Sequence, residues 1–340
     1  MKIQKLCVII GMALSLASCK NDNAVEDSSA MPAANIGVVV SSIDSNPFFQ
    51  GMHKSFQAVS QENSQLKVQL EASKDDQNLQ RTQIDSMLNN GAKALVVNLA
   101  DASIGAQFAN EMCTRNVPVV YINRSPGNAA LQKCKTAFFV GSDDEQGGIL
   151  QAQLVLENWR NHPEWDKNKD GKIQYAMLEG NYAIASAKLR ANWAAQSLKF
   201  YPQLGLGSEN VEAIFSETAK YNGDIAKEVV SRWAATPEFE QVEVILAGND
   251  NMALGAADAL ESVGKKVPIF GIDAVPRALE AQQQGRIFAT IANDYDTQSR
   301  IAVRMAANLA NNRPVMQGLD AIDLDDNHNV RVRLKRVSNQ

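Results

Sequence analysis

The sequence predicts an α/β protein built from doubly wound parallel sheets, and three observations support this fold class. Short apolar runs alternate with longer amphipathic stretches from Asn35 onward, as strands and helices alternate in such folds. Polar side chains gather directly after the apolar runs. The length of 340 residues suits two domains better than one, so we expect two lobes.

The predicted strands are eight short runs in which almost every side chain is apolar and many are β-branched. Parallel strands that helices cover on both faces have this composition. The runs are Ile36–Val40, Ala94–Val97, Val117–Ile122, Ala137–Val140, Tyr175–Leu178, Val242–Ala247, Val267–Ile272 and Phe288–Ile291.

The segments between these runs have helical periodicity. Phe49, Met52 and Phe56 recur at a spacing that places them on one face of a helix. A second amphipathic pattern ends before Gly91, a residue type that is favoured just after the last turn of a helix. Both patterns follow an apolar run or precede one, as the doubly wound fold requires.

Polar residues follow most of the predicted strands, where ligands bind in open parallel sheets. Some of them are expected to be helix N-caps. Amides and carboxylates nevertheless dominate, and their paired donors and acceptors suit a ligand with many hydroxyl groups, such as a polyol or a sugar. These segments are Asp44–Asn46, Asn98, Asn123–Arg124, Ser142–Asp144, Asn249–Asn251, Asp273 and Asn293–Asp294.

The N-terminus has the pattern of an exported protein. Residues 1–18 combine two lysines, an apolar run and small residues, which is typical of a secretion signal. The sequence Leu16-Ala17-Ser18-Cys19 is similar to a bacterial lipobox, which implies cleavage before Cys19 and acylation of this cysteine. The alternative is an ordinary signal with an accidental cysteine. Residues 19–34 are polar and small, as in a flexible tether. The protein would therefore contact the membrane only through its lipid anchor.

Charge and cysteine content narrow the functional class. Removing Lys2 and Lys5 with the signal leaves 31 basic against 38 acidic side chains, a net charge of about −7. A mildly acidic chain without a basic cluster is a poor candidate for nucleic-acid binding. Cys113 and Cys134 remain in an oxidising compartment, either as a disulfide or as two separate buried thiols.

Residues 166–174 match the opening of an EF-hand calcium loop, with Gly171 at the sharp turn. Met177 stands where the bidentate glutamate of such a loop belongs. The segment is therefore either an Asx-rich turn or a calcium site that a distant carboxylate completes, since oxygen donors favour calcium over transition metals. The loop itself would supply oxygens from Asp166, Asn168, Asp170, Lys172 and Gln174.

The order of strand ends, the calcium loop and the segment Asp326–Val332 together resemble the galactose/glucose-binding branch of the type I periplasmic binding proteins. The resemblance covers about residues 35–335, and the calcium loop is its most specific element. It implies two α/β lobes around a monosaccharide, a structural calcium completed by Glu243, delivery to the membrane subunits of an ABC importer and, in some members, contact with a chemoreceptor. A monomer is the expected state.

The resemblance also implies a set of sugar-binding residues. Phe48 would stack on one sugar face and Tyr221, where the family has a tryptophan, on the other. The segment Asn46–Phe49 is closer to the ribose-binding relatives. The full set is Asn46, Phe48, Asn123, Arg124, Arg190, Tyr221, Asn249, Asp273 and Asn293.

Two positions depart from the family pattern. A histidine and an aspartate of the family correspond to Ile184 and Ser186, so hydrogen bonding along one edge of the sugar is reduced. Galactose or glucose is the leading expectation; a pentose, a deoxy sugar or another hexose is the alternative.

The expected lobes are discontinuous, because the chain of this fold crosses between lobes three times. We expect crossings near Ser142, Asn293 and residues 319–326. The N-terminal lobe would contain residues 35–142 and 293–320, and the C-terminal lobe residues 143–292 and 321–340.

Two other functions are weighed against binding. A sugar-responsive transcription regulator shares the fold but needs a DNA-binding segment where this chain has a signal and a tether. An enzyme would need a catalytic group, and the three histidines, His53, His162 and His328, all lie away from the strand-end clusters. No phosphate-binding or hydrolase motif occurs, so we expect a protein that is not an enzyme.

Overall fold

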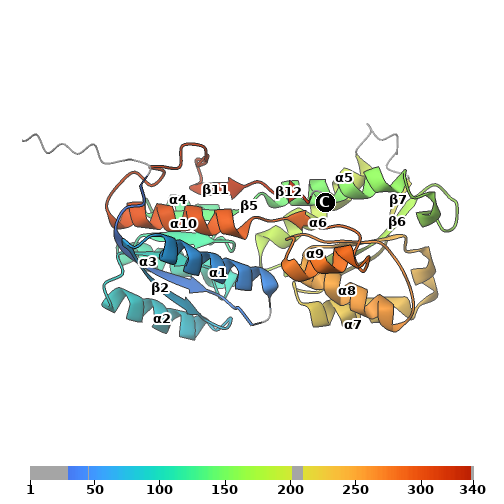
Figure 1. Cartoon of the computed structure of the whole chain (residues 1–340), viewed down its shortest axis with the longest axis horizontal. Helices are drawn as coiled ribbons and strands as arrows, with labels where there is room; N and C mark the ends of the chain where they lie inside the picture. The colour runs from blue at the N-terminus through green and yellow to red at the C-terminus, as the bar shows by residue number, and fades with distance from the viewer. Residues whose placement is uncertain (1–29, 45, 201–209, 338–340) are drawn as a thin grey trace, which may run out of the picture.

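The computed structural model describes residues 30–44, 46–200 and 210–337, which form two α/β lobes that lie side by side along the long axis of the molecule (Figure 1). The sheet of the N-terminal lobe has the order β11-β5-β4-β3-β1-β2, and all its pairings are parallel. Its strands are β1 (Ala34–Val40), β2 (Leu66–Ala72), β3 (Ala94–Val97), β4 (Val119–Ile122), β5 (Ala137–Ser142) and β11 (Asn329–Val332).

Helices cover both faces of this sheet, which explains why its central strands are completely buried. The long helix α10 returns from the C-terminal part of the sequence and packs against β1, β3, β4, β5 and α1. The helices of this lobe are α1 (Pro47–Glu62), α2 (Gln77–Asn89), α3 (Gly105–Thr114), α4 (Asn128–Gln132) and α10 (Tyr295–Ala310), with a 3₁₀ turn at Ala102–Ile104.

The C-terminal lobe repeats the design with a parallel sheet of order β7-β6-β8-β9. Single bridges after β9 extend this sheet to the segment that contains Ala289 and Ala292. The strands are β6 (Ile173–Glu179), β7 (Val211–Thr218), β8 (Val244–Ala247) and β9 (Ile269–Phe270). The helices are α5 (Asp144–Trp159), α6 (Ala185–Lys199), α7 (Gly223–Ala234), α8 (Asp250–Ser262) and α9 (Pro276–Gln283), with 3₁₀ turns at Pro163–Trp165 and Pro237–Gln241.

The chain passes between the lobes after β5, after β10 (Ile291–Ala292) and between β11 and β12 (Lys335–Arg336). β12 pairs antiparallel with β10. The expected assignment of residues 321–340 to the C-terminal lobe is therefore wrong for β11, which pairs with β5 from Asn329 opposite Phe139 onward. The third crossing lies at Arg333–Leu334, because a four-residue strand first completes the edge of the N-terminal sheet.

All eight predicted apolar runs coincide with strands or with bridged segments, whereas β2, β7 and the short strands β11 and β12 were not among the predicted strands. β2 and β7 are edge strands with one partner. Most of their side chains are half-buried or exposed, and several are polar, so neither strand has the continuous apolar run that marks a strand buried on both faces.

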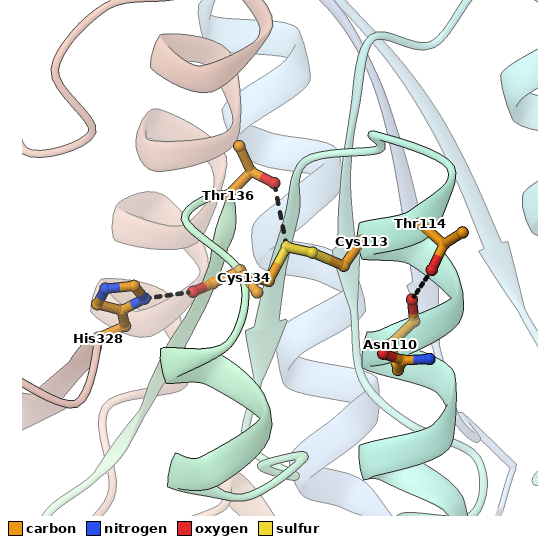
Figure 2. Close-up of a disulfide and its surroundings, with 7 residues drawn as sticks. Asn110, Cys113, Thr114, Cys134, Thr136 and His328 are labelled. Atoms are coloured by element: carbon orange, nitrogen blue, oxygen red, sulfur yellow. Dashed lines mark hydrogen bonds between the residues drawn. A yellow bond between two sulfur atoms is a disulfide. The ribbon is translucent and has the colours of Figure 1, made fainter.

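Cys113 and Cys134 form a disulfide with a Cα–Cα distance of 5.8 Å, which decides between the two alternatives left open by the sequence (Figure 2). The bond joins the end of α3 to the turn after α4. Thr136 contacts the sulfur of Cys134 at 3.5 Å, and His328 lies at 3.0 Å from the carbonyl oxygen of Ala137. The disulfide thus cross-links two helical segments of the N-terminal lobe.

Candidate functional site

A cavity of about 190 Å³ lies between the two lobes, at the carboxyl ends of their parallel strands. We call this cavity the cleft. All nine residues named as sugar-binding candidates line it. Side chains from both lobes therefore converge on one space. The lining consists of Asn46, Phe48, Phe49, Asp75, Asn123, Arg124, Asn181, Ile184, Ser186, Arg190, Lys220, Tyr221, Asn222, Asn249, Asp273 and Asn293.

Five of these residues have backbone angles that residues other than glycine seldom adopt. φ is 56° at Asp75, 63° at Asn123, 55° at Lys220, 62° at Tyr221 and 128° at Asp273. Such angles cost about 1–3 kcal/mol each and persist where the surrounding structure imposes them, often at functional sites. The strained residues lie in the turns that follow β2, β4, β7 and β9, and these turns direct side chains into the cleft.

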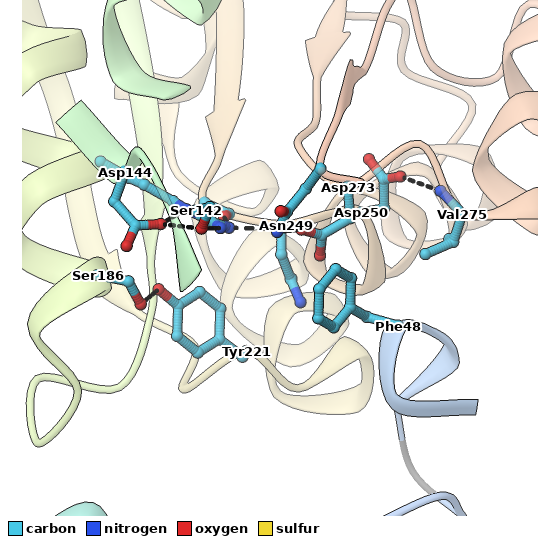
Figure 3. A network of polar contacts seen from close by, with 12 residues as sticks. Phe48, Ser142, Asp144, Ser186, Tyr221, Asn249, Asp250, Asp273 and Val275 are labelled. Carbon is cyan, nitrogen blue, oxygen red and sulfur yellow. Dashed lines mark hydrogen bonds and ion pairs between the residues drawn. The ribbon is translucent and has the colours of Figure 1, made fainter. Parts of the chain in front are cut away.

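Two aromatic rings flank the cleft. In Figure 3, the rings of Phe48 and Tyr221 lie on opposite sides of the side chain of Asn249. Phe48 packs edge-on against Tyr295 with a centroid distance of 5.5 Å. The hydroxyl of Tyr221 lies 3.0 Å from that of Ser186. Both rings are thus held by neighbours before any ligand binds.

Gly180 allows the ring of Tyr221 to approach the backbone closely. A Cβ atom at this position would lie 2.2 Å from Cζ of the tyrosine, so any larger residue would displace the ring.

Arg190 is the central cation of the cleft and is 5% exposed. Its Nε donates to Asp144 at 2.9 Å and its Nη1 to the carbonyl oxygen of Gly248 at 2.9 Å. Nη1 also lies 3.6 Å from Asp273. Asp144 does not line the cleft, so it acts by holding the guanidinium in place.

Asp273 and Asn293 form a hydrogen-bonded pair on the floor of the cleft. The amide of Asn293 donates to Asp273 at 3.0 Å, and its oxygen accepts from Gln298 at 2.7 Å. Burial raises the pKa of Asp273 to about 6, against the opposing field of the Arg190 guanidinium. The pair therefore presents a fixed acceptor and a fixed amide.

Asp250 lies behind this pair and supports the turn after β9. Its carboxylate accepts from the hydroxyl of Thr290 at 2.5 Å and from the backbone amide of Val275 at 2.9 Å. Burial, followed by the negative charge of Asp273, raises the pKa of Asp250 to about 7. The carboxylate thereby braces the strained backbone at Asp273.

Asn46 and Asn249 line the cleft and also cap helices. The Oδ1 atom of Asn46 accepts from the amide of Phe48 at 3.0 Å, and that of Asn249 from the amide of Met252 at 3.0 Å. The capping and ligand-binding interpretations of these residues are therefore compatible, because each cap uses only the oxygen of the side-chain amide.

Arg124 lies in the wall of the cleft, but its Nη1 is committed to the N-terminal lobe. It donates to the carbonyl oxygens of Leu99 at 2.7 Å and Ala100 at 2.9 Å and lies 3.2 Å from Asp75. The guanidinium also covers the ring of Phe49 at 5.2 Å. Arg124 thus shapes this wall, and its buried Nε makes no hydrogen bond among the described residues.

The sequence analysis missed five residues that line the cleft. Asp75 follows β2, and the segment with Lys220 and Asn222 follows β7. Neither strand has a continuous apolar run, so the sequence does not indicate that a strand ends next to these residues. The complete set of missed residues is Phe49, Asp75, Asn181, Lys220 and Asn222.

The proposed calcium ligands gather around one loop. Asp166 accepts from the amides of Asp170 at 3.1 Å and Gly171 at 3.0 Å, and the backbone is left-handed at Lys169 and Gly171. The amide of Lys172 donates to Asp170 at 2.8 Å. Within the residues described, no three carboxylate, histidine or cysteine groups lie close enough to form a metal cluster.

Glu243 reaches this loop from the segment before β8 and is 1% exposed. It accepts from the amides of Lys167 at 3.1 Å and Gln174 at 3.0 Å. Burial raises its pKa to about 7, with a further contribution from Asp166 and Asp170.

The side-chain amides of the loop face its carboxylates. Asn168 donates to Asp170 at 3.1 Å and to Gln174 at 3.0 Å. A half-turn of either amide exchanges its NH₂ for an oxygen. An oxygen-rich donor set with a buried carboxylate fits calcium.

The predicted signal peptide and Cys19 lie outside the residues that the structure describes. None of the described helices has the length and apolar character needed to cross a membrane. Among the described residues, no histidine lines the cleft.

Comparison with known proteins decides the family. Residues 36–314 match the family described as periplasmic binding protein domain. The chain belongs to the periplasmic binding protein family. Within this family it is 31% identical to the D-galactose/methyl-galactoside binding periplasmic protein MglB of Haemophilus influenzae, over 94% of this chain and 92% of that protein. It is 23% identical to the ribose import binding protein RbsB of Bacillus subtilis, over 84% and 85% of the two chains.

Solved structures confirm the type I periplasmic binding protein fold. An ABC transporter solute binding protein of Bacillus halodurans with bound myo-inositol has a TM-score of 0.71 and 23% identity, covering 91% of this chain and 96% of that one. An ABC transporter periplasmic solute binding protein of Actinobacillus succinogenes with bound D-allose has a TM-score of 0.72 and 22% identity, covering 89% of this chain and 96% of that one. The two-lobed architecture predicted for this periplasmic binding protein is thus confirmed.

Proposed function

We propose that this periplasmic binding protein captures a monosaccharide between its lobes and releases it unchanged to an ABC importer. The observation that carries the proposal is the cleft, in which Asp273, Asn293 and Arg190 face a space flanked by the rings of Phe48 and Tyr221. Fixed amides and charges bind hydroxyl groups, and flat rings cover the apolar faces of a sugar. Closure of the hinge would bury the ligand and create the surface that the importer recognises.

The names of relatives support a sugar as the ligand. The Haemophilus influenzae relative is named for D-galactose and methyl-galactoside, and a structural relative holds D-allose. Galactose or glucose remains our first expectation, with a pentose or another monosaccharide as the alternative.

The chemistry of the cleft supports binding without reaction. Its two acids, Asp75 and Asp273, both lie within reach of arginine side chains, an arrangement that fixes each carboxylate as a hydrogen-bond acceptor for a ligand. A role as an enzyme is therefore not proposed.

We further propose a structural calcium ion in the loop after α5. Side-chain oxygens of Asp166, Asn168, Asp170, Gln174 and Glu243, with the carbonyl oxygen of Lys172, would hold it. The ion would join the loop to the segment before β8 and so stiffen the C-terminal lobe.

We also propose that Cys19 carries the lipid anchor, which would hold the protein at the periplasmic or outer surface of a bacterial membrane. The proposed oligomeric state is a monomer. Contact with a chemoreceptor in addition to the importer is the second proposed partnership, as in some members of the family. Mass spectrometry of the membrane fraction tests the anchor directly, because an acylated N-terminal peptide beginning at Cys19 is expected and an unmodified peptide would refute it.

The central test is a thermal-shift screen with monosaccharides, followed by calorimetric titration of each hit. We expect at least one sugar to raise the melting temperature and to be recovered unaltered after incubation. Asn293→Ala should abolish the shift, whereas Asn110→Ala, an exposed position on α3, should retain it. A cleft variant that binds as tightly as the wild type, or a sugar that is converted during incubation, would refute the proposal.

A further inference from the structure

One wall of the cleft differs chemically from the others. Ile184 contributes an aliphatic side chain to the lining, whereas most of the remaining positions contribute amides, carboxylates, cations or aromatic rings. It belongs to the short segment between β6 and α6, which also supplies Asn181 and Ser186. An aliphatic group on a polar wall selects for the part of a ligand that contacts it.

Ile184 occupies the N-cap position of α6 without making a capping bond. Its backbone is extended, with φ −110° and ψ 125°, and no side-chain oxygen accepts from the first turn. Asn, Asp, Ser and Thr are preferred at this position, and aliphatic residues are disfavoured. By contrast, Asn222 and Asn249 cap α7 and α8 through their side chains. Ile104 of α3 and Val275 of α9 also lack a capping bond, but among these three residues only Ile184 lines the cleft.

The polar groups next to Ile184 are already engaged with each other. The hydroxyls of Ser186 and Tyr221 lie 3.0 Å apart, so one of their two O–H donors is committed. The Oδ1 atom of Asn181 accepts from the amide of Ala183 at 3.0 Å. A ligand hydroxyl placed against Ile184 would therefore lose its hydrogen bonds to water and gain few hydrogen bonds to the protein. This exchange is energetically unfavourable.

We propose that the ligand is a monosaccharide that turns a methyl or methylene carbon towards Ile184. Deoxy sugars or pentoses then bind more tightly than the hexoses from which they differ by one hydroxyl or hydroxymethyl group. This inference rests on the proposed sugar-binding function and favours its alternative ligands, a deoxy sugar or a pentose, over galactose and glucose.

Matched pairs of sugars test the inference by calorimetric titration of the full chain. The pairs are D-galactose with 6-deoxy-D-galactose, 2-deoxy-D-galactose and L-arabinose; D-glucose with 6-deoxy-D-glucose, 2-deoxy-D-glucose and D-xylose; and D-allose with D-ribose. At least one sugar that lacks the polar group should bind about ten- to a hundredfold more tightly than its parent, the range by which an apolar pocket rejects an added hydroxyl.

The preference for a less polar sugar and the sugar-binding function can be refuted separately. If every parent hexose binds as tightly as its partners or more tightly, the inference is overturned while the sugar-binding function stands. If no sugar in the panel binds, both are overturned.

Substitution of Ile184 separates selection from folding. Ile184→Asn should raise the melting temperature of the ligand-free protein, because asparagine caps α6. It should also reduce the preference for the less polar sugar by about tenfold, while Ile184→Val retains that preference. An unchanged affinity ratio in Ile184→Asn would show that this wall does not select the ligand, and the inference would fall.

Discussion

The side-chain amide of Asn293 donates to the carboxylate of Asp273 at 3.0 Å, and this bond ties the second lobe crossing to the end of β9. The floor of the cleft and the hinge therefore share a hydrogen bond. Movement of this crossing on lobe closure would shift the carboxylate of Asp273, which lines the cleft.

Asp273→Asn tests the contribution of that carboxylate. The variant keeps the shape of the side chain but removes its charge near Arg190. Hydrogen bonds to charged groups contribute about 1.5–3 kcal/mol, so sugar affinity should fall by about ten- to a hundredfold. Calorimetric titration measures the loss, and an unchanged circular dichroism spectrum controls for folding. Wild-type affinity in the variant would exclude Asp273 as a ligand contact.

Asp144→Asn should weaken sugar binding although Asp144 does not line the cleft. Its carboxylate accepts from Nε of Arg190 at 2.9 Å, and the neutral amide would hold the guanidinium less firmly. We expect a loss of about tenfold in affinity. The adjacent Asp143→Asn is the matched control, because Asp143 caps α5 and asparagine caps equally well. Equal losses in both variants would point to a general disturbance of α5.

The buried carboxylate of Asp250 predicts a pH dependence of stability. Because burial raises its pKa to about 7, the folded state binds more protons than the unfolded state between about pH 4 and 7. This contribution to stability is present at low pH and is lost as pH rises through 7. Asp273, whose pKa is raised to about 6, acts in the same direction.

Asp250→Asn should remove part of this dependence. Melting temperatures of the wild type and the variant, measured from pH 5.5 to 8, should converge at low pH and separate at high pH, with the variant more stable. Parallel curves over the whole range would contradict the assignment of the titration to Asp250.

The calcium proposal predicts that a chelator lowers the melting temperature of the wild type. Ligand binding to the native state alone raises stability by mass action, about 2.7 kcal/mol at a concentration one hundred times the dissociation constant. Glu243→Gln should abolish the difference between calcium and chelator. Glu240→Gln, an exposed neighbour paired with Lys265, should preserve it. A melting temperature that no chelator changes in the wild type would refute the metal site.

Reduction of the disulfide should destabilise the N-terminal lobe. The bond closes a segment with a sequence separation of 21 residues, which corresponds to about 3 kcal/mol in the chain-entropy treatment. Thermal unfolding with and without a reductant measures the loss, and a Cys113→Ser/Cys134→Ser variant should match the reduced wild type and be insensitive to the reductant. Equal melting temperatures in all samples would show that the bond contributes nothing.

The sequence predicted the fold where a strand is buried on both faces and failed where it is not. Val96 and Val120 belong to strands whose apolar composition is visible without a structure, and the turns after these strands carry Asn98 and Asn123. The edge strand β2 alternates along its length, so Asp75 was not connected to a strand end. Tyr221 follows the other edge strand and was identified only through resemblance.

The electrostatic arrangement of the site was beyond prediction from sequence because it depends on contacts between distant segments. Asp144 was noticed as a strand-end residue, but its bond to Arg190 spans 46 positions. Asp250 was grouped with Asn249, yet it supports the turn at Val275. The residues of the cleft could be predicted from the sequence, whereas the partner of each charged group could be identified only in the folded structure.

β11 and β12 come from the last described residues and belong to opposite lobes, since β11 extends the N-terminal sheet beside β5 and β12 pairs with β10. No single cut of the polypeptide can therefore separate the lobes into intact halves. Truncation before Asn329 leaves both lobes incomplete, so residues 329–336 must be synthesised before either lobe can complete its fold.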